Sequence, residues 1–259
     1  NGAQETRAYD TLDRLISSVQ TLPGVPGSFT VGYGYDANGN RTAMTTPWGG
    51  FAYVPDALNR VKRITDPAGR VFDFKFDDAG RRTDIERSIG ITTRYDYDDA
   101  GQLLAIRSTK LSNGAVISST AYRYDNAGNR DQMTDLAGVH QFAYDALNRL
   151  TGAQHPPGSA LPTRSETFGY DAVGNRTADA LATAYSHDAA NRIIGHSLAT
   201  FGHDADGNLT SQTSKALPAQ TTTYAYDSAN QLVGVQLPNA NQASFKYDGS
   251  GRRIEKAFT

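Results

Sequence analysis

The chain of 259 residues contains no cysteine, one tryptophan and two methionines. Without cysteine there is no disulfide framework and no thiolate nucleophile, whatever the redox compartment. Long apolar runs are also missing, since no stretch approaches the roughly 18 residues that a membrane span needs. The net charge is only −2, with a pI near 6.2. This balance argues against nucleic acid or an anionic membrane as the main partner.

A helical pattern is missing as well. No stretch repeats apolar residues at the spacing i, i+3, i+4 and i+7 that marks an amphipathic helix. The abundant residues are instead glycine, with 25 copies, and tyrosine, with 14. Glycine favours turns and tyrosine favours strands, so the composition predicts a protein of strands and turns.

One short phrase recurs along the chain. It reads FAYDALNRL at residues 142–150, YVPDALNRV at 53–61 and YAYDSANQL at 224–232. Its aspartate recurs at Asp10, Asp36, Asp56, Asp77, Asp98, Asp125, Asp145, Asp171, Asp188, Asp204, Asp227 and Asp248. Such a repeat indicates a fixed supersecondary unit joined by connectors of variable length.

Aromatic residues precede nearly every one of these aspartates, at the positions one and three residues before it. All 14 tyrosines of the chain lie at these two positions. Aromatic residues two apart share one face of a β-strand. We therefore predict an aromatic ladder across neighbouring hairpins, formed at the position next to the aspartate by Tyr35, Tyr97, Tyr124, Tyr144, Tyr170, Tyr226 and Tyr247.

The third residue after each aspartate is glycine, asparagine or, once, aspartate. These residues tolerate a positive φ, so an aspartate, two ordinary residues and this position predict a type I turn closed by a G1 bulge. The aspartate side chain would accept hydrogen bonds from the turn's own backbone. The predicted structural turn anchors are Asp36 with Gly39, Asp56 with Asn59, Asp77 with Gly80, Asp98 with Gly101, Asp125 with Gly128, Asp145 with Asn148, and Asp171 with Gly174.

Arginine and apolar residues nearly alternate at the fifth position after the aspartate, and arginine mostly follows the glycine-type turns. We interpret this alternation as a superperiod of two hairpins. The arginines would either stack on neighbouring aromatic rings or be solvated.

These residues resemble the YD or RHS repeat, with its signature YDxxGN/RL, of bacterial RHS and wall-associated proteins, toxin-complex components and teneurins. The resemblance extends from Tyr9 to Arg253. It implies a ribbon of β-hairpins that spirals into a hollow shell, which in bacterial members encloses a toxic C-terminal polypeptide. This sequence lacks the family's self-cleaving C-terminal segment and a toxin domain. Twelve hairpins are also few for a closed shell.

We accordingly predict an all-β fold in which tandem hairpins form a long, curved antiparallel sheet, with one repeat array over residues 1–259. The expected function is that of a non-catalytic segment of a secreted, extracellular or cell-surface shell that encapsulates or scaffolds a polypeptide cargo. Expected partners are flanking YD repeats, other copies of the chain and the enclosed cargo. An extracellular carbohydrate-binding module is the alternative, with glycans as the partner.

Few residues suggest chemistry. His187, His196 and His203 lie in adjacent repeats and would form a metal site or, the interpretation we favour, replace tyrosine as half-buried rings. Trp48 is either a sugar platform or, the preferred interpretation, a loop anchor. A hydrolase with a pair of carboxylates is the least favoured reading, because no sequence feature selects a pair. We therefore predict no catalytic residue, no metal and no cofactor.

Overall fold

The computed structural model describes residues 4–22, 24–159 and 165–259. These residues form 25 strands, all of the strand pairs are antiparallel, and no helix occurs among them. The predicted all-β fold of tandem hairpins is confirmed. The described part of the chain accordingly holds no helix of the length and apolarity that crossing a membrane would require.

The chain divides into two compact units, which are described separately. Among the described residues, the first unit holds 4–141 and 156–159, and the second holds 142–155 and 165–259. The repeat continues through both units, and a single array stays a prediction. Strands β1 to β13 are Gln4–Tyr9, Leu15–Thr21, Ser28–Tyr35, Arg41–Thr46, Gly49–Pro55, Val61–Thr65, Val71–Phe76, Arg82–Arg87, Ile91–Tyr97, Leu103–Lys110, Val116–Tyr124, Arg130–Asp135 and Gly138–Tyr144.

The second unit contains the remaining strands, and its early strands are short. Strands β14 to β25 are Leu150–Gln154, Ser165–Thr167, Gly169–Tyr170, Arg176–Ala178, Ser186–His187, Ile193–Gly195, Ala199–His203, Leu209–Ser214, Thr221–Tyr226, Leu232–Gln236, Gln242–Tyr247 and Arg253–Phe258.

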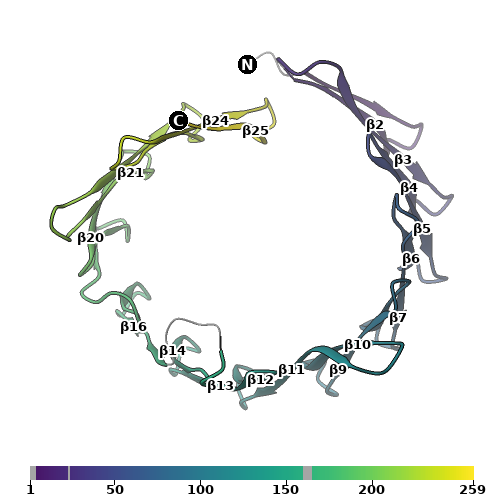
Figure 1. The fold of residues 1–259 in the computed structure, drawn as a ribbon, viewed down its shortest axis with the longest axis horizontal. Helices are drawn as coiled ribbons and strands as arrows, with labels where there is room; N and C mark the ends of the chain where they lie inside the picture. The colour runs from purple at the N-terminus through teal and green to yellow at the C-terminus, as the bar shows by residue number, and fades with distance from the viewer. Residues whose placement is uncertain (1–3, 23, 160–164) are drawn as a thin grey trace. The chain divides into compact units, whose positions relative to one another are not determined.

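Strands pair in the order in which they occur in the sequence (Figure 1). In the first unit β1 to β12 follow one another and β12 pairs with Gly138–Gln141 of β13. In the second unit β14 pairs with β15, β16 with β17, and β18 to β25 form one sheet. Each aspartate turn joins the two strands of a hairpin. Because successive strands run in opposite directions, the aspartate turns of a sheet lie at one side and the turns that connect successive hairpins lie at the other. We call these two sides the aspartate rim and the connector rim.

Beside the turn and its predicted G1 bulge, the hairpins whose register is described contain a second bulge that the sequence pattern did not indicate. In the β5–β6 pair, Pro55 faces Val61 and Val54 faces Arg63, which leaves Lys62 without a facing residue. The same shift occurs beside the aspartate turns of the β1–β2, β3–β4, β7–β8 and β24–β25 pairs. A bulge increases the local right-handed twist, so the repeated bulges give successive hairpins a common twist.

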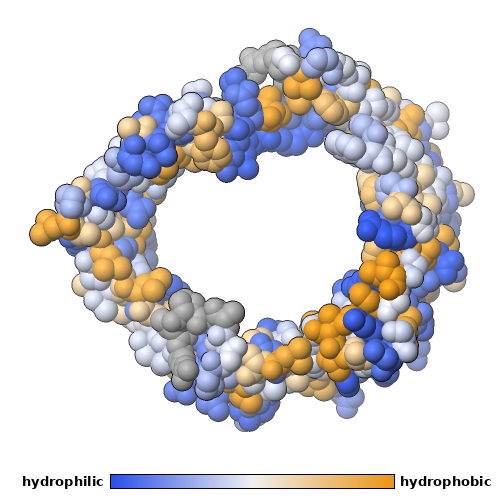
Figure 2. All heavy atoms as spheres, viewed as in Figure 1, coloured by the Kyte–Doolittle hydropathy of each residue, from blue (hydrophilic) through white to orange (hydrophobic). Residues whose placement is uncertain are grey.

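Each unit is built from single-layered sheet, and its core is correspondingly thin. The buried hydrophobic residues among those described are Ile85, Ala153, Ala182, Ala199 and Ala243. Apolar residues lie beside polar ones on the visible surface of the sheets (Figure 2). With so little burial, cohesion must come largely from backbone pairing and from contacts between neighbouring hairpins.

Regular pairing weakens around residues 165–200 of the second unit. The aspartates at 171, 188 and 204 are only 17 and 16 residues apart. This spacing leaves strands of two or three residues in β16 to β19. Short connectors therefore interrupt the sheet here, although the turn motif itself continues.

Candidate functional site

The aspartate turn is the unit from which the site is built, and the turn at Asp56 shows its geometry. The Asp56 Oδ1 accepts hydrogen bonds from the amides of Leu58 (2.9 Å) and Arg60 (3.0 Å). The Asp56 amide donates to the Arg60 carbonyl at 2.8 Å, and the Asn59 amide donates to the Asp56 carbonyl at 3.1 Å. One carboxylate oxygen thus satisfies two backbone donors that the turn would otherwise leave to water.

The third residue of every repeated turn lies in the left-handed region. Asn59 has φ 62° and Gly80 has φ 80°, and the side-chain types explain both values, because glycine has no Cβ and asparagine tolerates this region. Positive φ values occur at Asp13, Gly39, Asn59, Gly80, Gly101, Gly128, Asn148, Gly174, Asn191, Gly207, Asn230 and Gly251.

Most of the turn carboxylates have a lowered pKa and are thus stabilised in their ionised form. A hydrogen bond from the Arg60 side chain is the main cause that lowers the pKa of Asp56, and the backbone amides of the turn add to it. For Asp36 the corresponding main cause of the lowered pKa is the Asn40 side-chain amide. The turns therefore depend on charged aspartate.

Arginine at the fourth position after the aspartate joins one turn to the next. The Nε atom of Arg149 donates to its own Asp145 Oδ2 at 2.7 Å, and its Nη1 donates to the carbonyl of Asp171 in the next turn at 3.1 Å. Its guanidinium lies over the Tyr170 ring, 4.8 Å from the ring centre. Arg14 and Arg81 make the same set of three contacts in the first unit.

Asparagine at that fourth position makes a different junction. The Nδ2 of Asn40 donates to its own Asp36 and also to the Oδ1 of Asn59 in the next turn, at 2.7 Å. The same bond joins Asn175 to Asn191 and Asn208 to Asn230. A glycine-type turn with asparagine at its fourth position is thus followed by an asparagine-type turn. This bond is a physical cause for the order of the two turn types along the sequence.

Tyrosine hydroxyls provide a third junction. The Tyr35 hydroxyl donates to the carbonyl of Leu15 in the preceding hairpin at 2.9 Å. The equivalent bonds run from Tyr97 to Arg82, Tyr124 to Leu103, Tyr170 to Leu150 and Tyr247 to Leu232. Tyr144 and Tyr226 occupy the same place at the ends of β13 and β22. The five tyrosines with this bond therefore hold the preceding hairpin as well as presenting a ring.

The rings themselves lie on every second strand. Strands are about 4.8 Å apart, so rings in successive hairpins are about 9.5 Å apart and leave space for an intervening side chain. Arginines occupy that space, as Arg41 does over Tyr53 (4.7 Å) and Arg82 over Tyr95 (4.9 Å). Stacking, one of the two interpretations of the fifth-position arginines, is confirmed. Direct ring-to-ring contacts join Phe142 to His155, Tyr185 to His196 and His196 to Phe201. The ladder of tyrosines stays a prediction.

The histidines do not form a metal site in the described part of the chain, where no group of three potential ligands occurs. His187 and His203 are half-buried in β18 and β20. His196 instead packs between Tyr185 and Phe201, with ring centres 5.0 and 5.2 Å apart, and its Nδ1 accepts a hydrogen bond from the Leu198 amide.

Trp48 lies in the turn between β4 and β5 with 79% of its surface exposed. The preferred interpretation of this residue as a loop anchor is wrong, because an anchor would bury its ring. The indole belongs to the two-residue connection between Thr46 and Gly49 and is open to solvent. A glycan contact at Trp48 stays a prediction.

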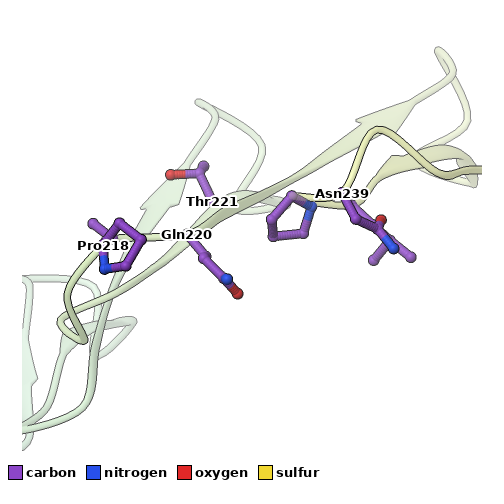
Figure 3. A pocket seen from close by; sticks show the side chains of 7 residues that line it. Pro218, Gln220, Thr221 and Asn239 are labelled. Carbon is purple, nitrogen blue, oxygen red and sulfur yellow. The ribbon is translucent and has the colours of Figure 1, made fainter.

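Two shallow depressions occur on the described surface. One, of about 590 Å³, lies between the β21–β22 and β23–β24 connections, and Pro218, Gln220, Thr221 and Asn239 line it (Figure 3). These groups offer no acid, base or nucleophile of the kinds that catalyse group transfer.

The second depression, of about 510 Å³, contains two carboxylates that face each other across β7 and β8, Asp73 and Glu86. Arg63 binds Asp73 through two bonds of 2.6 and 2.9 Å, and Lys75 pairs with Glu86. Each carboxylate is thus neutralised in a cross-strand ion pair, which is not the arrangement of a glycosidase acid and nucleophile.

One further turn of the same geometry escaped the sequence pattern. Asp66 accepts hydrogen bonds from the amides of Ala68 and Arg70, and Gly69 has φ 76°. It lies on the connector rim between β6 and β7. The aspartate, glycine and arginine spacing signals this turn, but Thr65 stands where tyrosine precedes most of the other aspartates.

Comparison with known families agrees with this geometry. Residues 137–258 match the teneurin YD-shell family, and residues 56–88 match the RHS repeat. The hairpins repeat an aspartate turn and are joined by tyrosine and arginine contacts. Together with the family matches, these features define a YD-repeat protein of the shell-forming class. The chain belongs to the RHS/YD-repeat family.

Curated relatives are much longer than this chain. It is 28% identical to the double-stranded DNA deaminase toxin A of Burkholderia cenocepacia, with 97% of the chain and 20% of that protein covered. It is 30% identical to the probable deoxyribonuclease RhsA of Dickeya dadantii, with 99% of the chain and 17% of that protein covered. The chain therefore spans about a fifth or less of the length of these relatives.

A solved structure supports the fold. The crystal structure of TcdB2-TccC3-TEV matches with a TM-score of 0.63 over 96% of the chain and 17% of the matched one. The sequences are only 13% identical, so the likeness concerns the fold alone.

Proposed function

We propose that this chain is a non-catalytic wall segment of a secreted RHS/YD-repeat protein, placed outside the cell or at its surface, that helps to enclose or scaffold a polypeptide cargo. One observation carries the proposal: neighbouring turns are joined by the same arginine, asparagine and tyrosine contacts along both units. Such an array stabilises an extended surface and leaves its strongest polar groups engaged in holding that surface together.

The relatives support the cargo part of the proposal. Their names describe a deaminase toxin and a deoxyribonuclease, while this chain spans 17–20% of their length. We assign the named activities to parts of those proteins outside the matched repeats. The aromatic side of the sheet, which includes Tyr53, Phe74 and Tyr95 and has no second layer within its unit, would face the cargo.

A chimera tests this function. The chain would replace the matching repeats of RhsA, and protease resistance of the C-terminal part would be compared with that of unaltered RhsA. Retained resistance supports the wall role. Rapid digestion of that part in a chimera whose far-ultraviolet circular dichroism is still that of β-sheet would contradict it. The isolated chain should release no product in deaminase and nuclease assays.

The carbohydrate-binding alternative has Trp48 as its proposed contact. No observation in the structure favours this function over the wall segment.

A further inference from the structure

The charged side chains of the first unit are divided unequally between the two sides of its sheet. Strands β3 to β11 lie within residues 28–124, which the structure describes without a gap, and their carboxylates are Asp73, Asp84, Glu86 and Asp96. Asp73 lies between Phe72 and Phe74 on β7, and the register places the other three carboxylates on the same side as Asp73. In these strands, the aromatic side therefore bears no carboxylate.

The carboxylates of that opposite side are mostly paired. The ion pairs there are Arg63–Asp73, Lys75–Glu86 and Arg94–Asp96. Cations and carboxylates of this side thus largely offset each other, so the side attracts neither sign of partner strongly.

Arginines of the aromatic side have no such carboxylate beside them. Arg41 and Arg82 each face the ring that precedes the turn of their own hairpin, which places them on this side. Their guanidinium groups lie over Tyr53 and Tyr95 of the following hairpins. Both arginines are exposed, and within residues 4–22, 24–159 and 165–259 neither side chain forms a hydrogen bond or an ion pair. Their positive charge is therefore uncompensated.

Stacking leaves the hydrogen-bonding edge of each guanidinium group open. Its five N–H donors lie in the plane of the group, so a ring below that plane does not occupy them. A carboxylate can approach in the same plane and accept two parallel hydrogen bonds. Because the ring already holds the arginine, less side-chain entropy is lost when a partner binds.

The spacing of these arginines favours an extended polypeptide as the partner. Arg41 begins β4 and Arg82 begins β8, so four strands, or about 19 Å, separate them, and Arg130 at the start of β12 continues this interval. An extended chain covers that distance in about six residues. The half-buried rings of Tyr53 and Phe74 lie between the first two arginines and suit apolar side chains. A nucleic acid has a phosphate at every nucleotide, and most of them would lie over rings without a cation.

We propose that the aromatic side of the first unit binds an extended acidic segment of polypeptide. Carboxylates about six residues apart bind Arg41 and Arg82, and apolar side chains between them contact the rings. The inference rests on the proposed function and deepens it by stating the chemistry of the cargo segment that the wall holds.

Fluorescence anisotropy with synthetic peptides tests this inference. The probe is a labelled, unstructured peptide with glutamate at every sixth position and leucine and serine between. It should bind the chain at least roughly tenfold more tightly than the same peptide with glutamine, and raised salt should weaken its binding. Equal binding of the two peptides, or no binding of either, would overturn the proposal. Tighter binding of a single-stranded oligonucleotide would overturn it as well.

Paired substitutions locate the binding side. Arg41→Gln with Arg82→Gln should weaken binding of the glutamate peptide by roughly tenfold or more, and lysine at both positions should recover part of it, because the charge is restored. The matched control is Arg94→Gln with Arg107→Gln, which removes two arginines that face each other on the opposite side and should leave binding unchanged. Circular dichroism would verify that each variant is folded. Equal losses in the two glutamine pairs, or no recovery with lysine, would contradict the assignment.

The chimera separates this inference from the proposed function. Peptide binding without protection of the C-terminal part would refute the wall function alone. Protection without selective binding of the glutamate peptide would refute this inference alone.

Discussion

The guanidinium of Arg149 lies over the ring of Tyr170, 4.8 Å from its centre, while the hydroxyl of the same tyrosine binds the carbonyl of Leu150 at 2.9 Å. Two neighbouring residues of one repeat, Arg149 and Leu150, thus both contact the same tyrosine of the next repeat. Each contact is modest, and the repeat multiplies it along the sheet.

Arg149→Ala should destabilise the chain by about 1–3 kcal/mol, because it removes one cation–π contact and two charge-assisted hydrogen bonds. Arg149→Lys should recover part of the loss, since a lysine cannot bond both turns in the same planar geometry. Urea unfolding would measure the change. Arg94→Ala, at a 71% exposed side chain, is the control and should shift stability by less than about 0.5 kcal/mol. Equal effects of both substitutions would argue against the bridging role.

Tyr124→Phe should cost about 0.5–1.5 kcal/mol, because the variant keeps the ring but loses the hydrogen bond from its hydroxyl to the Leu103 carbonyl. Tyr53→Phe is the matched control: its ring also lies under an arginine, and its hydroxyl makes no such bond among the described residues. Thermal melting of the two variants side by side would separate the contribution of the hydroxyl from that of the ring. A control that melts as low as Tyr124→Phe would refute this assignment.

Gly80→Ala should destabilise the chain by about 1–2 kcal/mol, because an alanine at φ 80° is strained. Crowding is not the cause, since a Cβ there would meet only the Arg60 Nη1, at 3.7 Å. Gly249→Ala offers a contrast within the same kind of turn, as that glycine has no positive φ and a Cβ would contact nothing within 4 Å. We expect this control to be neutral or stabilising in chemical denaturation. A loss at Gly249 as large as at Gly80 would remove the backbone explanation.

Low pH should reduce the stability that the turn carboxylates contribute. Arg60 lowers the pKa of Asp56, and the Arg14 backbone amide lowers the pKa of Asp10. A carboxylate whose pKa is lower in the folded state contributes stability above its unfolded pKa, near 4, and loses that contribution as the pH falls through the folded value. The melting temperature should therefore be nearly level between about pH 5 and 7 and fall below about pH 4.

The Asp56→Asn variant checks the source of this acid sensitivity. It should melt lower at neutral pH and lose part of the pH dependence, whereas Asp99→Asn, at the exposed second residue of the Asp98 turn, should follow the unaltered profile. Melting that is independent of pH down to pH 3 would show that the turn carboxylates contribute nothing.

The sequence predicted the hairpins well because each turn is coded locally. An aspartate and a residue that tolerates positive φ lie three positions apart, and no distant contact is needed to place them. The junctions between repeats were harder to predict. The bond from Asn40 to Asn59 and that from Tyr35 to Leu15 join residues 19 and 20 positions apart, and only the register of neighbouring strands brings them together.

The junctions between turns reach back only about one repeat: Tyr35 to Leu15 spans 20 residues, and Tyr247 to Leu232 spans 15. Such a junction needs no residue from a distant part of the polypeptide. Each newly synthesised hairpin can therefore form these contacts with the preceding hairpin as soon as it has been synthesised, because contacts of low sequence separation form first. Folding can then proceed in one direction along the chain, without threading one segment through another.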